Sequence, residues 1–443
     1  MLNPSRTYKP TNLPWIDQIP KDWELIPVKH LFFLVTEKAP EGNSEELLSL
    51  YTHIGVKPRN ELEERGNKNS TQDGYQVVKK GDIVINKMLA WMGAISLSEY
   101  DGVTSPAYDV LRPKSYVNAY FYHYLFRMPQ MYSYFKVFSR GILDMKLRLY
   151  FEQLGQLKTI VPPYPEQNAI VKFLDEKLKL IDGYIEKKQK LITLLEEQKK
   201  AIINEAVTKG LDPTVKMKDT GIEWLGEVPE EWEVKRLKYC SEVKYSNVDK
   251  NFEVNEIPVK LCNYVDVYKN EYITETLDFM YGSATNNEIE KFRLISDDVI
   301  ITKDSETAND IANAAYVPYY LPNTICGYHL AIMSSNKAFL GGKFLYYLFK
   351  TDQFHKQFEL GANGVTRYGL GKSKINDAYI PLPNIEMQNR IALHLDLIVD
   401  SFENIKSKFK NQILNLESLK PSIISEAVTG KIDCRKYIED TKP

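Results

Sequence analysis

Residues 162–212, PPYPEQNAIVKFLDEKLKLIDGYIEKKQKLITLLEEQKKAIINEAVTKGLD, have a near copy in residues 383–433, PNIEMQNRIALHLDLIVDSFENIKSKFKNQILNLESLKPSIISEAVTGKID. Aligned without a gap, the two stretches share 18 identities in 51 positions. That is too many for two unrelated helices, so the chain contains an internal duplication, and a duplication sets the architecture before any local pattern does.

Both copies have the pattern of a long coiled-coil helix. No proline occurs from Glu166 to Thr208, and apolar residues recur there at gaps of three, four and seven. The first seam consists of Ile170, Leu174, Leu178, Ile181, Ile185, Ile192, Leu195, Ile202 and Ala206. The second seam repeats it in register at Ile391, Leu395, Val399, Phe402, Phe409, Ile413, Leu416, Ile423 and Ala427. Each helix is therefore the expected partner of the other.

The predicted helices are long enough to act as spacers. At 1.5 Å per residue, a helix from Glu166 to Thr208 is roughly 65 Å long, well beyond an ordinary globular helix. Lys199 and Lys420 interrupt the two seams at the same step. Pro421 is expected to kink or end the second helix near Leu419. An ordinary buried helix is the alternative, and the length and the duplication argue against it.

Two further anchors extend the repeat to the rest of the chain. WIDQIPKDWE at residues 15–24 recurs as WLGEVPEEWE at residues 224–233, and GDIVINK at residues 81–87 answers to DDVIITK at residues 297–303. The shift between the copies grows from 209 to 216 and then to 221, so each half has a variable part before its constant helix. We predict globular domains at 1–160 and 213–380, helices at 161–212 and 381–433, and a tail at 434–443.

The variable parts have the pattern of mixed α/β domains. Short β-rich runs, such as residues 82–85, 103–111, 299–302 and 324–333, are broken by Gly, Asn and Asp turns. Aromatic stretches at residues 119–126 and 343–349 are predicted to be helical. The expected fold class is α/β, with two globular domains of about 150 residues joined by two long helices.

Several loops of the variable parts combine cations, amides and aromatics. Lys and Arg neutralise phosphates, while Arg and Asn can form paired hydrogen bonds to base edges. A solvated turn is the alternative for any single loop, but the loops come in two sets. The candidate DNA-contacting residues are Lys57, Arg59, Lys87, Trp91, Arg140, Lys146, Arg148, Lys303, Thr307, Asn309, Arg367, Tyr368, Lys372 and Lys374.

Composition excludes several other classes of protein. The net charge of −2 gives no global attraction to nucleic acid, so any electropositive surface has to be local. Four cysteines without a C-x-x-C pair indicate neither a disulfide framework nor a zinc site, and they fit a reducing cytoplasm. No signal peptide and no run of 18 apolar residues is present, so we expect a soluble cytoplasmic protein without a membrane partner.

No convincing catalytic or metal site is visible in the sequence. Val161-Pro-Pro-Tyr164 resembles a motif with which amino-methyltransferases hold a target amine, but Val161 stands where the amide or acid is needed. The six histidines form no metal-spaced pair, and the Gly-x-Ser-x-Gly and Gly-x-Gly-x-x-Gly motifs are absent. We therefore assign no catalytic residue, no metal ligand and no cofactor to this chain.

Three segments resemble the specificity subunits of type I restriction-modification systems. They are the domain-opening DTGIEWLGEVPEEWEV at residues 219–234, the PPYPEQ entry ending at Gln167, and the helix-closing EAVTGKID ending at Asp433. With the duplicated layout, the resemblance covers essentially the whole chain. The first-half opener has Leu13-Pro14-Trp15 where the second has Ile222-Glu223-Trp224, which is a modest departure.

The resemblance implies two target-recognition domains, each reading one half of a split DNA site, held apart by two antiparallel helices. It also implies assembly with two modification (methyltransferase) subunits, and with two restriction subunits into an ATP-driven nuclease for phage defence. S-adenosylmethionine, ATP and Mg are then needed by the partner subunits. Because the two variable parts differ, the half-sites should differ as well.

Two other functions are left open by the residues alone. A coiled-coil adaptor that joins two protein partners without touching DNA would fit the near-zero net charge. An enzyme that acts on DNA by itself is disfavoured by the missing motifs. A split DNA footprint of the assembled complex separates the first from a DNA reader, and methyl transfer or cleavage by the lone chain identifies the second.

Overall fold

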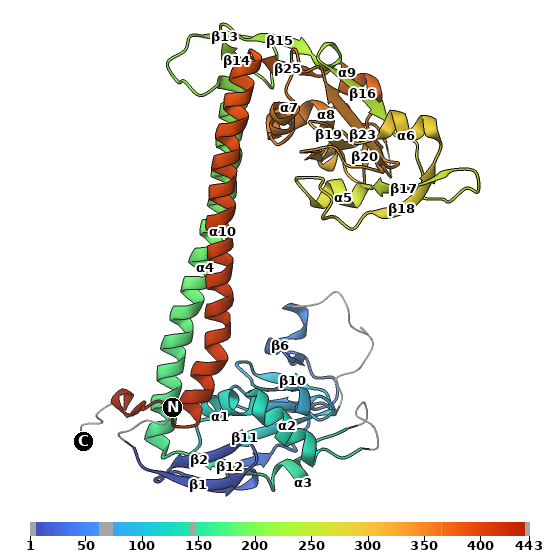
Figure 1. Ribbon diagram of the computed structural model, residues 1–443. Coiled ribbons are helices and arrows are strands. Elements are labelled where there is room, and N and C mark those ends of the chain that lie inside the picture. The colour runs from blue at the N-terminus through green and yellow to red at the C-terminus, as the bar shows by residue number, and fades with distance from the viewer. Residues whose placement is uncertain (1–5, 62–73, 142–146, 365, 439–443) are drawn as a thin grey trace. The chain divides into compact units, whose positions relative to one another are not determined.

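The computed structural model describes residues 6–61, 74–141, 147–364 and 366–438 (Figure 1). It divides into two compact units. Unit 1 comprises residues 1–188 and 411–443, and unit 2 comprises residues 189–410. Each unit therefore contains one globular domain and one section of each long helix, α4 (Tyr164–Lys209) and α10 (Ile385–Val428). The division into five segments predicted from the sequence stays a prediction.

The globular domain of unit 1 is built on an antiparallel sheet of four strands. Their order is β4 (Phe32–Leu34), β11 (Tyr108–Pro113), β8 (Ile83–Asn86) and β9 (Ile95–Leu97). All four residues of β8 are buried, as expected for a central strand covered on both faces. Four two-stranded pairs surround this sheet: β1 (Tyr8–Leu13) with β2 (Ile16–Pro20), β3 (Glu24–Pro27) with β12 (Lys158–Val161), β5 (Leu48–Tyr51) with β6 (Gly55–Pro58), and β7 (Gln76–Val78) with β10 (Gly102–Thr104).

Among its described residues, this domain also has the α-helices α1 (Ala119–Phe126), α2 (Pro129–Phe138) and α3 (Phe151–Leu154). The side chain of Asn118 accepts a hydrogen bond from the amide of Tyr120 and so caps α1. The buried face of α1 is aromatic, and Phe121 and Tyr122 pack edge-on against Trp23 and Phe32. The helix predicted at residues 119–126 is confirmed.

The globular domain of unit 2 repeats the same sheet. Its order is β16 (Ser241–Tyr245), β23 (Leu330–Ser335), β19 (Val299–Thr302) and β21 (Ala314–Tyr316). Additional strands are β13 (Met217–Asp219), β14 (Glu227–Pro229), β15 (Glu233–Arg236), β17 (Ile257–Cys262), β18 (Met280–Ala284), β20 (Asp304–Ser305), β22 (Thr324–Cys326), β24 (Tyr368–Gly369) and β25 (Tyr379–Leu382). The equal strand order, with β19 again fully buried, shows the duplication at the level of the fold.

The helices of this domain are α5 (Tyr264–Lys269), α6 (Asn286–Phe292), α7 (Gly342–Phe349), α8 (Asp352–Glu359) and α9 (Lys372–Asn376). The predicted helix at residues 343–349 is confirmed as α7. Two predicted strand runs are each split by a turn. Residues 103–111 divide into β10 and β11 at the turn that Ser105 closes with Tyr108, and residues 324–333 divide into β22 and β23.

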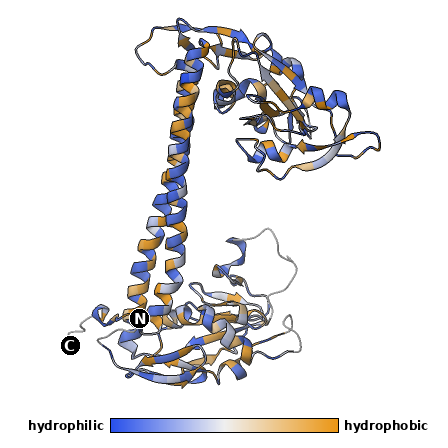
Figure 2. Cartoon of the chain, viewed as in Figure 1, coloured by the Kyte–Doolittle hydropathy of each residue, from blue (hydrophilic) through white to orange (hydrophobic). Residues whose placement is uncertain are grey.

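The two long helices follow the predicted seams. Ile181 and Ile192 of α4, and Ile391 and Leu395 of α10, are buried, and apolar residues recur along both helices among polar ones (Figure 2). Of the two effects expected of Pro421, a kink or an end of the second helix near Leu419, the end is wrong, because α10 continues to Val428, and the kink stays a prediction. Val428 and its neighbours lie in the core of unit 1, and this packing outweighs the one hydrogen bond that proline removes.

Within each unit the helix sections run antiparallel. In unit 1, Lys188 donates to Gln412 at 2.6 Å, and Lys420 pairs with Asp182. In unit 2, Lys406 donates to Glu196 at 2.6 Å and Lys199 donates to Glu403 at 2.7 Å. In both units the partner number on α10 falls as the number on α4 rises. The predicted antiparallel coiled-coil pairing is confirmed in each unit.

Residues that are identical in the two copies fix each domain to its helix. Gln167 donates to the carbonyl of Pro162 and accepts from the amide of Asn118 at the start of α1. Its counterpart Gln388 donates to the carbonyls of Pro383 and Phe339 and accepts from the amide of Gly341 before α7. The glutamine shared by the two copies therefore joins each globular domain to the start of its long helix.

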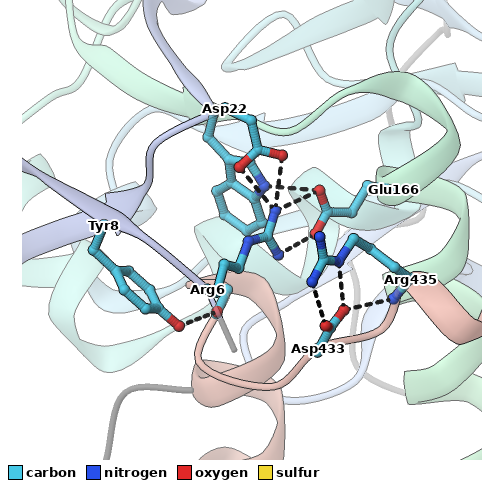
Figure 3. A network of polar contacts seen from close by, with 8 residues as sticks. Arg6, Tyr8, Asp22, Glu166, Asp433 and Arg435 are labelled. Atoms are coloured by element: carbon cyan, nitrogen blue, oxygen red, sulfur yellow. Dashed lines mark hydrogen bonds and ion pairs between the residues drawn. The ribbon is translucent and has the colours of Figure 1, made fainter. Parts of the chain in front are cut away.

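A polar network ties the N-terminal strand to the segment that follows α10 (Figure 3). Arg6 pairs with Glu166 at the start of α4 and with Asp22, and the indole of Trp23 donates to Glu166 at 2.9 Å. Tyr8 donates to the carbonyl of Gly430 at 3.0 Å. The first and last described segments of unit 1 are thus held at one end of its helix pair.

Among the described residues, no helix combines the length and the apolar character that crossing a lipid bilayer requires.

Candidate DNA-contacting surfaces

The same junction of backbone occurs in both globular domains. β8 is followed by Lys87, whose carbonyl accepts from the amide of Leu149 at 2.8 Å, and β19 is followed by Lys303, whose carbonyl accepts from the amide of Leu370 at 2.8 Å. In each case the donating residue directly follows an isolated antiparallel bridge, Arg140–Arg148 or Asn363–Gly369. The structure thus brings together loops that are far apart in the sequence.

We call these regions the first and second junction surfaces. The first junction surface contains the candidates Lys87, Trp91, Arg140 and Arg148. The second junction surface contains the candidates Lys303, Thr307, Asn309, Arg367 and Tyr368. Lys372 and Lys374 lie on α9, which follows this surface in the sequence, and both are exposed. Lys146 lies outside the described residues.

The exposed cations of the first junction surface are the two bridged residues, Arg140 and Arg148. Arg140 and Arg148 are both exposed, and the guanidinium of Arg148 is 3.5 Å from the hydroxyl of Tyr150. The ring of Trp91 is half-buried, its indole donates to the carbonyl of Met88, and the ammonium of Lys136 lies 5.1 Å from the ring centre. Both arginines are exposed enough to reach phosphates or base edges, and Arg148 would give up only its long contact to Tyr150.

Lys87, in contrast, is an internal contact. Its ammonium donates to the carbonyl of Pro106 at 2.9 Å and lies 3.4 Å from the carboxylate of Asp109, with 18% of the side chain exposed. Burial raises the pKa of Asp109, and the charge of Lys87 acts in the opposite direction. Lys87 therefore stabilises an ionised carboxylate near the end of β8.

Lys57 and Arg59 come from the β5–β6 hairpin of the same domain. The ammonium of Lys57 donates to the hydroxyl of Tyr100 at 2.8 Å, and this hydrogen bond raises the pKa of Lys57. Arg59 opens a short 3-10 helix and is half-buried. It lies close enough to Tyr108 to lower the pKa of that phenol, which burial raises, and Tyr108 pairs with Asn86 at the end of β8. Arg59 is thus near the first junction surface.

Lys303, the counterpart of Lys87, is also held inside its domain. Its ammonium lies 5.2 Å from the ring centre of Tyr245 and 4.8 Å from that of Tyr328. It donates to the carbonyl of Ser246 at 2.9 Å, and burial lowers its pKa. A single cation between two aromatic rings supports the loop instead of pointing at solvent.

Arg367 is the exposed cation of the second junction surface. Its Nη2 donates to Oδ1 of Asp304 at 2.6 Å, and 54% of the side chain is exposed. The other carboxylate oxygen of Asp304 lies 2.5 Å from Nδ1 of His329. Sequence reasoning missed both partners. Asp304 stands in a loop that was singled out for its cation, whereas His329 follows a turn that carried no signal.

The remaining candidates lie around this group. Thr307 and Asn309 are exposed before and within the short 3-10 helix at residues 308–310. Tyr368 is half-buried, and its backbone pairs with Ser305 across β20 and β24. Among the described residues, no group of three or more His, Cys, Asp or Glu side chains could hold a metal ion. The surface offers hydrogen-bond donors, amides and aromatic rings, which are the groups that bind nucleic acid.

The fold and the two junction surfaces define a class: a recognition protein with two copies of one domain, each presenting a different set of polar loops. The family model for the type I restriction modification DNA specificity domain matches residues 20–196 and 229–415. The chain belongs to this family and carries the domain twice. It is a DNA-recognition subunit of a type I restriction-modification system, and catalysis is not its role.

Relatives with known roles match over nearly the whole chain. The specificity subunit of the type I restriction enzyme MjaVIII from Methanocaldococcus jannaschii is 23% identical over 423 residues, which cover 94% of each chain. The MjaIX specificity subunit of the same organism is 24% identical over 445 residues, with 94% of this chain and 95% of that protein covered. Their names agree with the family predicted from the sequence.

Two solved structures share the fold. One belongs to a study of complex assembly and conformational transition of the type I R-M system, with a TM-score of 0.67, 14% identity and coverage of 94% of this chain and 99% of that one. The HsdS subunit from Thermoanaerobacter tengcongensis gives a TM-score of 0.59 at 15% identity, with 94% and 98% covered. The predicted fold class is confirmed. Family membership also decides against the adaptor and the lone enzyme.

Proposed function

We propose that each globular domain reads one half of a bipartite, asymmetric DNA sequence, and that α4 and α10 set the gap between the halves. The supporting observation is the pair of junction surfaces. Their backbone ties are the same, Leu149 to Lys87 and Leu370 to Lys303, but their exposed side chains differ. Equal frames position the loops in the same way, while different side chains select different bases.

The long helices are the proposed docking surfaces for two modification subunits. Large apolar side chains outside the seam are exposed on both helices: Leu180, Tyr184, Leu414 and Leu419 in unit 1, and Leu191, Leu194, Leu393 and Leu397 in unit 2. A helix pair that leaves such residues in water is typical of a protein–protein interface. Because the duplication gives two related faces, two copies of one partner are expected, and restriction subunits would join this complex.

The chemistry belongs to the partners in this proposal. The modification subunits would bind S-adenosylmethionine, and the restriction subunits would use ATP and Mg. This chain contributes the choice of sequence and needs no cofactor for it. We place its work in the cytoplasm, where the chromosomal DNA of a restriction-modification host is modified.

Single-molecule sequencing of methylated bases tests the proposal. Genomic DNA is compared between cells that express the chain with its modification partner and cells that lack only this chain. We expect a split, asymmetric methylated motif that disappears with the chain. If the complex assembles and no motif depends on the chain, the reading role is wrong.

A further inference from the structure

Resting on the proposed function, we propose that Arg367 reads a guanine in the second half-site, and that Asp304 and His329 are the residues that position it. Nothing in the sequence pattern assigned a role to Asp304 or His329. The structure places both half-buried side chains in contact with the one exposed guanidinium of the second junction surface, counted over its described residues.

The contact is centred on the half-buried carboxylate of Asp304, whose side chain is 15% exposed. Its two oxygens are used by different partners, Oδ1 by Arg367 and Oδ2 by His329, and Nδ1 of His329 also lies 3.5 Å from Nη2 of Arg367. Because an ionised carboxylate only accepts, Nδ1 of His329 carries the proton toward it. Asp304 can therefore rotate little without losing both contacts, and the direction of the Arg367 donor is fixed in advance.

The imidazole of His329 is in turn held by an aromatic neighbour. Its ring centre lies 4.0 Å from that of Tyr328, and the ammonium of Lys303 lies 4.8 Å from the ring centre of the same tyrosine. His329 has a φ of 72°, a left-handed conformation that is uncommon for residues other than glycine. The turn before β23 thus brings the imidazole to Asp304, and the packing of Lys303 and Tyr328 keeps it there.

The charge balance favours a base over a phosphate. Asp304 neutralises Arg367 at 2.6 Å, and the residue that follows it, Ser305, donates to a second carboxylate, Asp310, at 3.4 Å. A cation whose charge is cancelled attracts an anionic phosphate weakly. Its remaining N–H groups keep their direction and their hydrogen-bonding capacity toward a neutral acceptor. Phosphates are better served by the exposed Lys372 and Lys374.

Guanine is the base that fits these donors. In the major groove it presents two acceptors, O6 and N7, and a guanidinium donates to both at once. Adenine and thymine each present a single acceptor there, N7 or O4, and cytosine presents only an amino donor, so none of them accepts both N–H groups of an arginine. The device is specific to the second domain. When the two sheets are aligned by their strand register, Met88 is the counterpart of Asp304 and Ala107 is the counterpart of His329. The first half-site therefore has to be read differently.

The test uses the full chain assembled with its modification subunits and a duplex that carries the motif found by methylation sequencing. Each guanine of the second half-site is replaced in turn by 7-deazaguanine, which removes only the N7 acceptor. We expect one replacement to weaken binding of the unaltered complex about tenfold or more. The same replacement should have almost no further effect in Arg367→Ala, because the lost partner is the same.

Two positioning variants complete the experiment. Asp304→Asn should weaken binding to the motif and reduce discrimination at that guanine, and His329→Asn, which tolerates a positive φ, should do the same to a smaller degree. Arg236→Ala is the matched control, because Arg236 forms an exposed pair with Asp377 at 3.1 Å in the same domain. It should leave the discrimination at every position unchanged.

The opposing outcomes are distinct. If Arg367 contacts a phosphate, no 7-deazaguanine matters, and Asp304→Asn tightens binding to all sequences by removing a negative charge. That result, or a second half-site without guanine, overturns the guanine assignment while the bipartite motif stands. If the unaltered complex shows no preference for the motif over a scrambled duplex, the proposed function fails and this inference fails with it.

Discussion

At the scale of single residues, the two halves of the repeat stabilise an equivalent aspartate in different ways. Asp82 precedes β8 and accepts two hydrogen bonds from the guanidinium of Arg112, at 2.9 and 2.8 Å. Its counterpart Asp298 precedes β19, where Ser334 replaces the arginine and donates at 2.8 Å. Asp298 is 1% exposed and has no such cation, so burial raises its pKa to about 6.

This difference predicts a pH-dependent stability of unit 2. In the folded chain Asp298 keeps its proton up to about pH 6, whereas the unfolded carboxyl loses it near the ordinary value of 3.8. The stabilisation is therefore fully present below that value and is lost as the pH rises through 6. Between pH 4.5 and 7.5, the free energy of unfolding should fall by about 1–3 kcal/mol more in the unaltered chain than in Asp298→Asn.

Urea unfolding of both chains at the two pH values measures this difference. Asp82→Asn is the control, and it should destabilise the chain at pH 7.5 because it removes the partner of Arg112. A parallel pH dependence of the unaltered chain and Asp298→Asn would contradict the assignment of the proton to Asp298.

At the scale of elements, the joint between each domain and its helix rests on one glutamine. Gln388 is fully buried and makes three hydrogen bonds to backbone groups of Gly341, Phe339 and Pro383. Gln167 makes two bonds of this kind. Removing either side chain leaves a buried proline carbonyl and part-buried backbone groups without this partner, and such a loss exceeds the net gain of an average hydrogen bond.

Gln388→Ala should therefore lower the free energy of unfolding by about 2–4 kcal/mol, and Gln167→Ala by somewhat less. The measurement is urea unfolding of the full chain. Asn389→Ala, next to Gln388 but exposed, is the control and should change stability by less than about 0.5 kcal/mol. Equal unfolding midpoints for Gln388→Ala and Asn389→Ala would show that the hydrogen bonds of Gln388 do not stabilise the chain.

The helix pair also contains two lysines at equivalent steps of the seam with unequal surroundings. Lys199 is 12% exposed and contacts Glu196 at 2.9 Å and Glu403 at 2.7 Å. Burial lowers its pKa, but the hydrogen bonds to these two carboxylates outweigh burial and raise it overall. Lys420 is 30% exposed and pairs with Asp182, which is 60% exposed.

Reversing the charge should consequently be more harmful at Lys199. Lys199→Glu places a third carboxylate in a half-buried cluster, and we expect a loss of about 2–3 kcal/mol, against less than about 1 kcal/mol for Lys420→Glu. Thermal unfolding at low and at 0.5 M salt measures both. Adding Glu403→Lys to Lys199→Glu should recover part of the loss, and failure to recover any of it would mean that the cluster does not act as an ion-pair network.

The long helices and their pairing could be predicted because the same heptad seam occurs twice in the sequence. Such a periodic pattern can be recognised without knowing which distant residues pack against it. The helix end expected at Pro421 does not occur, because the packing of Val428 in the core of unit 1 outweighs the local effect of the proline. The candidate surfaces were predicted only as loops. Lys87 and Lys303 could not be recognised as internal contacts, since the carbonyls of Pro106 and Ser246 that hold them belong to other loops, 19 and 57 residues away in the sequence.

At the scale of the whole molecule, duplication separates what has to stay the same from what can change. The strand order and the glutamine joint are the same in both halves, while the junction surfaces diverge. Arg59 belongs to unit 1 and Arg367 to unit 2. They share no partner among the contacts described above, so their contributions to DNA binding are expected to be independent.

This independence gives a quantitative expectation for the assembled complex. Arg59→Ala and Arg367→Ala should each relax the methylated motif in one half only, and the affected halves should be opposite. If each weakens binding about tenfold, the double variant should weaken it about a hundredfold, because free energies of distant, unshared contacts add. Titration of the motif duplex, with methylation sequencing of the same variants, measures both. A double variant no weaker than either single one would mean that the two domains engage DNA as one cooperative surface, and the duplicated fold would then serve a single reading event instead of two.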